Sequence, residues 1–463
     1  MGKKRQKKQL RLAYRLARQG EALQGQGGGS AVSRAERGNE SPTESPSQGL
    51  MEEVCERENM RRAVRRVQAN KGSAGVDGMG VGALESYLRE HWPAIREQLL
   101  SGTYKPQPVK RVEIPKPDGG VRNLGIPTVL DRCIQQAVLQ VLQGVFEGTF
   151  SEHSYGFRPG RSAHQAVGQA QAYIASGYGW VVDIDLEKFF DRVNHDMLMS
   201  RVARRVEDKR MLKLLRAFLN AGVMEGGLVS RSEEGTPQGG PLSPLLSNIM
   251  LDDLDKELEQ RGHRFVRYAD DCNIYVRSER AGQRVMESVS GFIVRRLKLR
   301  VNQEKSAVAK PSERSFLSFS FSAGKEPRRQ IAGKALKRMK LRVRELTRRT
   351  RGVKLERVVA DLSPYLRGWV GYFGYCETPE VLKRLDSWVR RRLRCYVWRQ
   401  WQHGRGRYAG LLKRGVSPSL ARGTAGSNKG PWRLSHSIAM SKAFPTSHFQ
   451  SLGLPLLWAE PAV

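Results

Sequence analysis

Cysteine is scarce in this chain of 463 residues, and its placement excludes common metal and redox motifs. The five cysteines are Cys55, Cys133, Cys272, Cys376 and Cys395. They form no CxxC pair, and no Cys/His cluster has the spacing of zinc ligands. We therefore predict a reduced, intracellular protein without structural zinc.

Long apolar runs and acidic charge are also lacking. No run reaches the roughly 18–20 apolar residues that a membrane-spanning helix needs, and the basic N-terminus lacks the apolar stretch of a signal peptide. Asp and Glu number 46 against 80 Lys and Arg, a formal net charge of +34. Such a surplus opposes compaction unless a polyanion neutralises it, so we expect a nucleic-acid partner and no membrane. Charge alone does not separate a polymerase from a ribosomal or chromatin-like binder.

The first 50 residues have few large apolar side chains. Residues 3–18 are basic and favour an arm that lies on RNA, with a nuclear address as the alternative. Residues 21–50 are rich in Gly, Ser, Glu and Gln, and they cannot bury enough surface to offset the entropy of ordering. We predict a largely disordered basic extension over 1–50 and a helix over 51–70, which the Gly-rich segment after it ends.

The centre of the chain alternates between helical and strand-like patterns, and the pattern predicts an α+β fold with antiparallel pairing. The turn PKPDGG at 115–120 should join two of the strands in a hairpin. A helix is expected at 134–146. The expected strands are 109–115, 121–127, 181–186, 265–269 and 273–276.

From about 333 to 403 the chain becomes helical and strongly basic. Leu336, Met339, Val343 and Leu346 form one apolar stripe at helical spacing, and Lys and Arg occupy the other faces. The segment 388–401 repeats this arrangement with aromatic residues interleaved. We predict a module that grips a phosphate backbone; a merely solvated charged face is the alternative.

Two acidic elements point to a metal site. FVRYADDCNIYV at 265–276 places Asp270 and Asp271 at the tip of a hairpin. Adjacent carboxylates raise each other's pKa unless a cation lies between them, and Mg²⁺ prefers such oxygen ligands. In VVDIDL at 181–186, Asp183 and Asp185 share one strand face and could complete a site for two-metal catalysis. Alone, the Asp pair also fits an ordinary turn. His164 and His195 are expected to be structural or surface residues.

Four segments together match a known family. They are YADD at 268–271, GTPQGGPLSPLLSNIML at 235–251, HSYGFRPGRSAHQA at 153–166 and VEIPKPDGGVRNLGIPTVLDR at 112–132. With them the chain resembles the maturase-reverse transcriptases encoded by bacterial group II introns, and it looks most similar to the class C proteins. The resemblance covers nearly all of the chain from about Met51 onward.

This resemblance implies a right-hand polymerase of the α+β class, followed by an α-helical thumb and maturase domain. No HNH endonuclease is expected, because no cysteine follows Cys395, so priming should use an existing 3′ end. The expected regions are the N-terminal extension and fingers at 51–165, the palm interleaved with the fingers at 166–325, the thumb and maturase (X) domain at 326–403, and a short basic nucleic-acid-binding region at 404–463.

The family's catalytic Asp stands six residues before a second Asp that aromatics precede, a pattern that Asp185 and Asp191 match. The resemblance therefore implies that Asp185, Asp270 and Asp271 hold two Mg²⁺ ions, with Mn²⁺ as a substitute and the backbone carbonyl of Leu186 as a further ligand. Asp183 is then a structural carboxylate.

Other roles follow from the resemblance in the same way. A bulky aromatic at Phe190 should clash with a ribose 2′-OH and favour dNTPs; a core Phe is the alternative. The residues expected to bind dNTP are Lys116, Arg122, Phe190, Gln238 and Lys305. Those expected to bind nucleic acid are Arg158, Arg338, Arg342, Arg391 and Arg392. The family usually has Gly where Ser318 stands, and Ser should crowd the primer backbone slightly.

The resemblance thus implies an RNA-directed DNA polymerase that copies intron RNA during retrohoming and assists splicing. Its expected partners are the group II intron RNA, a template-primer RNA/DNA duplex, target DNA and dNTPs. It should act as a ribonucleoprotein in the bacterial cytoplasm, associated with the nucleoid when it acts on DNA. The alternatives are a domesticated reverse transcriptase of DNA repair or defence, and a splicing factor without catalysis.

Overall fold

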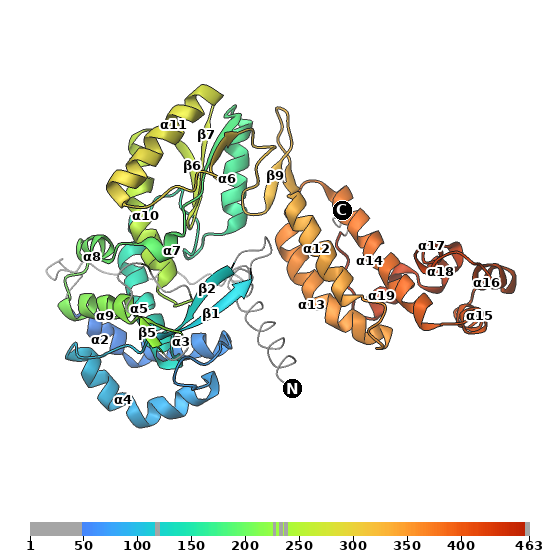
Figure 1. The fold of residues 1–463 in the computed structure, drawn as a ribbon, viewed down its shortest axis with the longest axis horizontal. Helices are drawn as coiled ribbons and strands as arrows, with labels where there is room; N and C mark the ends of the chain where they lie inside the picture. The colour runs from blue at the N-terminus through green and yellow to red at the C-terminus, as the bar shows by residue number, and fades with distance from the viewer. Residues whose placement is uncertain (1–48, 116–120, 226–227, 231–234, 236–238, 459–463) are drawn as a thin grey trace, which may run out of the picture. The chain divides into compact units, whose positions relative to one another are not determined.

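The computed structural model describes residues 49–115, 121–225, 228–230, 235 and 239–458 (Figure 1). The chain divides between Lys310 and Pro311 into two compact units, and this division lies before the expected start of the thumb at 326. Within the described residues, no helix is long and apolar enough to cross a membrane.

The first unit begins with helices that pack around α5. The helix expected over 51–70 is wrong in one respect, because Glu56 has an extended backbone (φ −59°, ψ 140°) and divides it into two helices. The side chain of Thr128 caps α5 by accepting a hydrogen bond from the backbone N–H of Asp131. The elements are α2 (Leu50–Cys55), α3 (Arg57–Ala69), η2 (Val81–Ala83), α4 (Leu84–Leu100) and α5 (Val129–Phe146).

A four-stranded sheet of order β2–β1–β4–β5 lies beside these helices (Figure 1). Strands β1 and β2 pair antiparallel up to Pro115 and Val121, which confirms the predicted hairpin. Strand β4 joins β1 in parallel. The strands are β1 (Val109–Pro115), β2 (Val121–Ile126), β4 (Val223–Glu225) and β5 (Leu228–Ser230).

A second four-stranded sheet, of order β6–β7–β3–β8, is antiparallel throughout, as predicted. Helix α11 covers one face, where a Cβ at Gly282 would lie 2.4 Å from a methyl of Val308. Helix α6 covers the other, with the rings of Tyr173 and Tyr275 5.8 Å apart (Figure 1). The elements are β3 (Trp180–Ile184), β6 (Arg264–Tyr268), β7 (Asp271–Val276), β8 (Ala307–Ala309), α6 (Ala163–Ala175) and α11 (Glu279–Phe292).

One apolar core joins the N-terminal helices to this second sheet, with Leu50, Leu142 and Ile274 among its members. His195 is buried and hydrogen-bonds the side chain of Asn220 and the carbonyl of Gly235, which confirms its structural role. The remaining elements of the unit are η3 (Glu147–Thr149), α7 (Phe189–Arg192), α8 (His195–Ala203), α9 (Lys209–Asn220), α10 (Ser243–Gln260) and the π-helical turn η4 (Ile293–Leu297).

The second unit opens with a two-stranded hairpin and continues as helices. The apolar stripe predicted for α12 is confirmed, because Met339 and Val343 are fully buried and Leu336 is half-buried. The elements are β9 (Phe319–Phe321), β10 (Arg329–Ile331), α12 (Gly333–Leu346), α13 (Leu355–Phe373), α14 (Pro379–Gln400), α15 (Gly404–Lys413), α16 (Pro418–Ala425), α17 (Pro431–Leu434), α18 (Ile438–Ala443) and α19 (Thr446–Ser451). The five cysteines are free thiols.

Candidate active site

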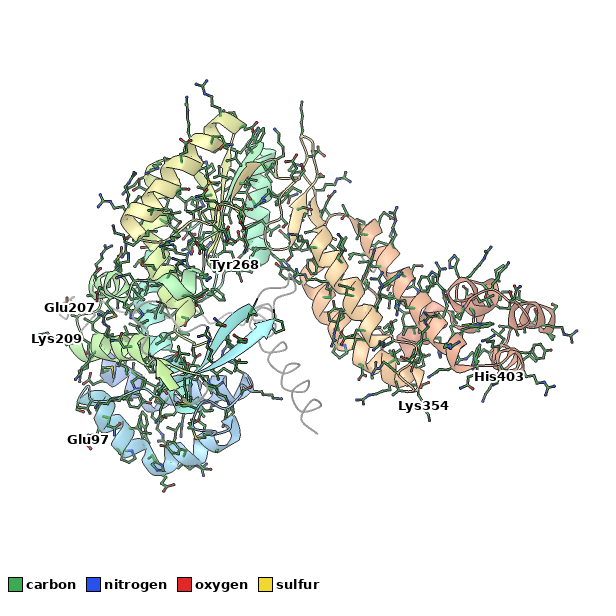
Figure 2. All side chains as sticks on the ribbon, in the orientation of Figure 1. Glu97, Glu207, Lys209, Tyr268, Lys354 and His403 are labelled. Carbon is green, nitrogen blue, oxygen red and sulfur yellow. The ribbon has the colours of Figure 1, made fainter. Side chains whose placement is uncertain are left out.

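Strand register gathers the acidic residues at one end of the second sheet. In the antiparallel pairing of β3 with β7, Ile184 stands opposite Cys272, so the next residue of each strand end is Asp185 and Asp271. Opposed residues of such a pair have Cα atoms about 4.5–5.5 Å apart. Tyr268, which is labelled in Figure 2, ends β6 and pairs with Asp271 of β7. This pairing leaves Asp270 in the two-residue turn between the strands. The hairpin predicted from YADD is confirmed.

Burial and like charges act in the same direction on the acidic side chains of this turn. Burial raises the pKa of Asp271 well above its usual range, and the neighbouring carboxylates of Asp183, Asp270 and Asp185 raise it further. The side-chain amide of Asn273, which donates to Asp271 over 3.1 Å, lowers the pKa and so opposes them. A divalent cation would remove this repulsion, and a set of carboxylate oxygens is the ligand type that Mg²⁺ prefers.

The carboxylates of Asp185, Asp270 and Asp271 are not spaced closely enough to hold a metal ion in this structure. Across the described part of the chain, no group of three or more His, Cys, Asp and Glu side chains is arranged to hold a metal ion. The ligand set Asp185, Asp270 and Asp271 therefore stays a prediction, supported by strand register and by the shared electrostatics.

The backbone around Asp185 is held by a neighbouring loop. Its N–H donates to Ser306 Oγ over 3.0 Å, and its carbonyl accepts from the N–H of Asn302 over 2.8 Å. Leu186 follows in an antiparallel bridge with Val301. Lys305 lies in the same loop with an exposed side chain, so this predicted dNTP-binding residue is next to the aspartates in the fold.

Phe190 is half-buried in α7, where its ring meets the ring of Phe189 edge-on at 5.2 Å. Gly235, with φ +93°, packs against the backbone of Phe190. A Cβ at Gly235 would lie 2.8 Å from the carbonyl oxygen of Phe190. Two other predicted dNTP-binding residues, Lys116 and Gln238, lie outside the described residues, as does the side chain of Arg122.

Sequence reasoning missed the buried arginine that hydrogen-bonds the acidic turn at 269–270. Arg267 and Asp255 are both fully buried and form a bidentate ion pair, with Nε–Oδ1 and Nη2–Oδ2 distances of 2.7 and 2.5 Å. Arg267 also donates to the carbonyl of Ala269 over 2.8 Å, to Asn248 Oδ1 over 3.0 Å and to Ser154 Oγ over 2.8 Å. All five N–H bonds of the guanidinium are thereby used.

A glycine completes this support. A Cβ at Gly156 would lie 2.3 Å from the backbone nitrogen of Ala269, so only Gly lets the two segments approach. The amide of Asn248 donates to the carbonyl of Gly156 over 2.8 Å. Ala269 itself has a left-handed backbone, with φ 58°. Three of the segments that carried the family resemblance therefore meet behind the acidic turn.

The sequence contains one signal for this network. Arg267 occupies the same strand face as Phe265, which is a core position, and a charged residue there needs a buried partner. The identity of that partner, Asp255 on α10, depends on the tertiary fold.

Two of the predicted nucleic-acid contacts are engaged within the protein. Arg158 is 7% exposed and bonds Glu147 and the carbonyls of Ser151 and Ser154, so its assignment to nucleic acid is wrong: the guanidinium is enclosed in protein. Arg392 is half-buried and donates to Thr347 Oγ1 at the end of α12 over 2.7 Å.

The other three are less enclosed. Arg338 is exposed and donates to Ser318 Oγ over 3.2 Å. Arg342 forms a surface ion pair with Glu345. Arg391 donates to the carbonyl of Trp432 over 3.0 Å. Their contact with nucleic acid stays a prediction.

Comparison with known protein families agrees with this fold. Residues 114–321 match the family described as reverse transcriptase (RNA-dependent DNA polymerase), and residues 336–415 match the group II intron, maturase-specific domain. The chain belongs to the reverse transcriptase family and carries the maturase-specific domain of group II intron proteins. Members of this family are RNA-directed DNA polymerases that use divalent metal ions.

Individual relatives cover different parts of the chain. Protein YkfC of Escherichia coli is 35% identical over 301 residues, which is 56% of this chain and 79% of YkfC. The group II intron-encoded protein LtrA of Lactococcus lactis is 30% identical over 342 residues, so 60% of this chain spans 57% of LtrA. A chain of a partial Cas6-RT-Cas1–Cas2 complex matches 53% of this chain and 42% of its own length, at 26% identity and a TM-score of 0.35.

Proposed function

We propose that this chain copies group II intron RNA into DNA at Asp185, Asp270 and Asp271, with two Mg²⁺ ions as cofactors. The observation that carries the proposal is the register of β3, β6 and β7, which brings the three acidic residues to one sheet end. Bound there with the carbonyl of Leu186 as a further ligand, the ions would activate the primer 3′ oxygen and stabilise the leaving pyrophosphate. Mn²⁺ is the expected substitute.

The neighbouring residues would select and hold the incoming nucleotide. Phe190 lies five residues after Asp185, and its ring would exclude a ribose 2′-OH. Lys305, with Lys116 and Arg122, would bind the triphosphate through charge-assisted hydrogen bonds. Gln238 would contact the nucleotide or its template base.

The second unit would hold the nucleic acid. Lys334, Lys337, Arg338 and Arg344 are exposed on α12, and they follow one another at helical spacing around the exposed Leu341. Together with Arg342 and Arg391 they form a basic surface for the template-primer duplex, the intron RNA and the target DNA. The protein would act as a ribonucleoprotein in the bacterial cytoplasm, at the nucleoid when target DNA is bound.

Primer extension on an RNA template tests the polymerase proposal. The wild-type protein should extend a DNA primer with dNTPs when Mg²⁺ is present and should stop when the ion is chelated. With ribonucleotides extension should be slow, because the ring of Phe190 would occupy the space that a 2′-OH needs. Rapid ribonucleotide incorporation would remove Phe190 as the selecting residue, and absence of DNA synthesis in a folded, RNA-binding protein would overturn the proposed reaction.

A second role in splicing is favoured by the match of residues 336–415 to the maturase-specific domain. The protein should accelerate splicing of its intron RNA at low Mg²⁺ without any dNTP, because this role needs RNA binding and no polymerisation. An intron that splices equally fast with and without the protein would exclude it.

A further inference from the structure

The second unit contains a hollow of about 470 Å³ that the proposed polymerase reaction does not use. Three surfaces meet there: α14, the end of α12 with the loop after it, and α17. Four arginines and two tryptophans form most of its wall. The lining residues are Arg344, Arg348, Arg349, Trp388, Arg392, Cys395 and Trp432.

Cation–π contacts with arginines hold the indole rings of Trp388 and Trp432 in position. The guanidinium groups of Arg344 and Arg392 lie 5.8 and 5.6 Å from the centre of the Trp388 ring. Arg391 lies 4.1 Å from the Trp432 ring and also donates to the Trp432 carbonyl. Trp388 is half-buried, whereas Trp432 is 38% exposed and forms the open rim. The rings are therefore positioned, and one of them is open to a ligand.

Hydrogen bonds hold Arg392, another residue that lines the pocket. Arg392 donates to the hydroxyl of Thr347 and, over 3.3 Å, to the Thr347 carbonyl, so it binds the C-terminal end of α12. Burial lowers the pKa of Arg392, and the neighbouring charges of Arg344 and Arg349 lower it further. The cations here repel one another, and an anion would relieve that repulsion.

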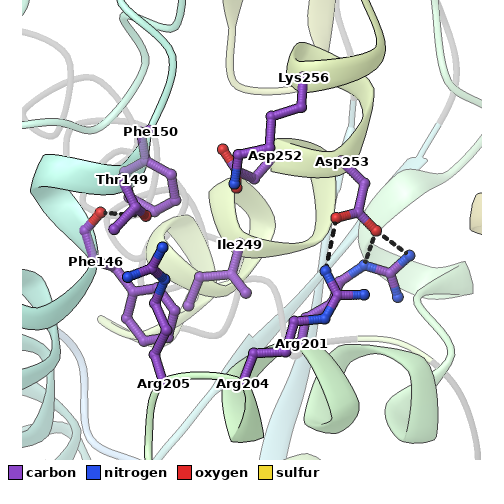
Figure 3. Close-up of a pocket in the computed structure, with 10 residues that line it drawn as sticks. All are labelled: Phe146, Thr149, Phe150, Arg201, Arg204, Arg205, Ile249, Asp252, Asp253 and Lys256. Carbon is purple, nitrogen blue, oxygen red and sulfur yellow. Dashed lines mark hydrogen bonds and ion pairs between the residues drawn. The ribbon is translucent and has the colours of Figure 1, made fainter.

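None of the seven lining residues, all of them in the described part of the chain, is acidic. A hollow of about 300 Å³ in the first unit shows the contrast (Figure 3). There Arg201 and Arg204 both bond Asp253, and Lys256 pairs with Asp252. In that hollow, Asp252 and Asp253 neutralise the basic side chains. The residues that line the pocket of the second unit include no carboxylate, so an anionic ligand could neutralise its arginines.

The side chains also indicate the class of ligand. Guanidinium groups match the oxygens of a phosphate, and an exposed tryptophan offers a face on which a base can stack. A base can use that face only if it is not already paired and stacked in a duplex. We propose that this Arg–Trp pocket binds one unpaired nucleotide of an RNA strand, with its phosphate against the arginines and its base against Trp432.

The surface that leads to the pocket supports an RNA strand over a free nucleotide. The exposed basic residues of α12, from Lys334 to Arg344, lie on one helix face, and Arg344 is itself one of the residues that line the pocket. An RNA backbone that follows this face reaches the pocket. The inference rests on the proposed RNA partner and adds to it the place where an unpaired nucleotide is held.

Salt-dependent RNA binding separates the two parts of the pocket. Affinity is measured by fluorescence anisotropy with a short single-stranded RNA, after unlabelled template-primer has filled the polymerase site. Trp432→Ala should weaken binding at least about fivefold at every salt concentration, because it removes stacking alone. Arg348→Gln with Arg349→Gln should weaken binding and should also reduce the magnitude of the negative slope of log K against log salt by about 1.4, because two phosphate contacts are lost.

Matched controls come from the same unit. Trp458 lies under Lys383, with Nζ 4.2 Å from the ring centre, and Arg384 is exposed on α14; neither lines the pocket. Trp458→Ala and Arg384→Gln should change neither the affinity nor the slope. Circular dichroism before each titration removes any variant that has not folded.

Three outcomes would overturn the proposal that the pocket binds an unpaired nucleotide. One is wild-type affinity in both pocket variants, and another is an equal loss with blunt RNA duplex, which would indicate a phosphate surface without base stacking. The third is a 5-iodouridine RNA that crosslinks elsewhere than Trp388 or Trp432. Primer extension by the wild type is measured separately, so a pocket that fails while extension succeeds leaves the proposed polymerase intact.

Discussion

The acidic turn of the first unit and the Arg–Trp pocket of the second both gather like charges, and they hold them in different ways. Behind the turn, a fully buried guanidinium uses every N–H to bond three separate segments. In the pocket, long arginine side chains stack on indole rings at the surface. Bond-making chemistry needs atoms placed to a fraction of an ångström, whereas binding a phosphate and a base needs mainly charge and a flat face.

The largest difference should come from the acidic turn itself. Asp270→Ala should lower primer extension by roughly 10²–10³-fold or more, because a proposed metal ligand is lost. RNA affinity and splicing assistance should stay near the wild-type values, since the second unit is unchanged. The exposed Glu207, replaced by Ala, is the control. Loss of splicing in a folded Asp270→Ala protein would show that the two activities are not separable.

Removal of the buried cation should cost stability and activity together. Arg267→Met leaves Asp255 charged and unpaired in the core, a cost of about 3–5 kcal/mol. The double variant Arg267→Met, Asp255→Leu should regain most of that stability, measured as the midpoint of urea unfolding. It should not regain primer extension, because the Ala269 carbonyl still lacks its donor. If the double variant polymerises like the wild type, the network serves stability alone.

A smaller change behind the same turn should act mainly on turnover. In Gly156→Ala the new methyl would lie 2.3 Å from the nitrogen of Ala269, so the turn must shift, at about 1–3 kcal/mol of strain. We expect kcat to fall while the KM for dNTP changes little. Gly148→Ala is the matched control, because a Cβ there meets nothing within 4 Å. An equal fall of kcat in both variants would refute the effect of the close approach.

The smallest expected effect on stability is at Ser318, in the tight turn between Phe316 and Phe319. Ser318 has φ 67°, the conformation that glycine adopts most readily. Ser318→Gly should therefore stabilise the protein by about 0.5–1 kcal/mol, with part of the gain offset by the lost hydrogen bond from Arg338. The same change at Ser320, inside β9, should destabilise it by about 0.5–1 kcal/mol. Thermal unfolding of both variants gives the two signs.

Much of the fold could be predicted because its signals are local. Alternating side chains gave the hairpin around Asp270 and Asp271, and helical spacing gave the buried stripe of α12. The expected Gly position at Ser318 also has a physical basis, since its backbone is left-handed. These features depend on residues close together in the chain.

What the sequence did not reveal depends on distant partners. Glu56 breaks a helix without Pro or Gly, so the break reflects how α2 and α3 pack on α5. From the sequence, Arg158 is predicted to be a surface cation. In the folded chain its guanidinium donates hydrogen bonds to the carbonyls of Ser151 and Ser154, and local sequence does not predict these contacts. The pairing of Arg267 with Asp255 likewise depends on the packing of α10 against β6.

The hydrogen bond between Ser154 and Arg267 joins residues 113 positions apart, which has a consequence for dividing the chain. A cut between 156 and 248 puts Ser154 and Gly156 on one fragment and Asn248, Asp255 and Arg267 on the other. Neither fragment alone could then form the hydrogen bonds that support the acidic hairpin. DNA synthesis should therefore be recovered only when the two fragments associate. A cut in the loop between Leu346 and Leu355 leaves that support on one piece.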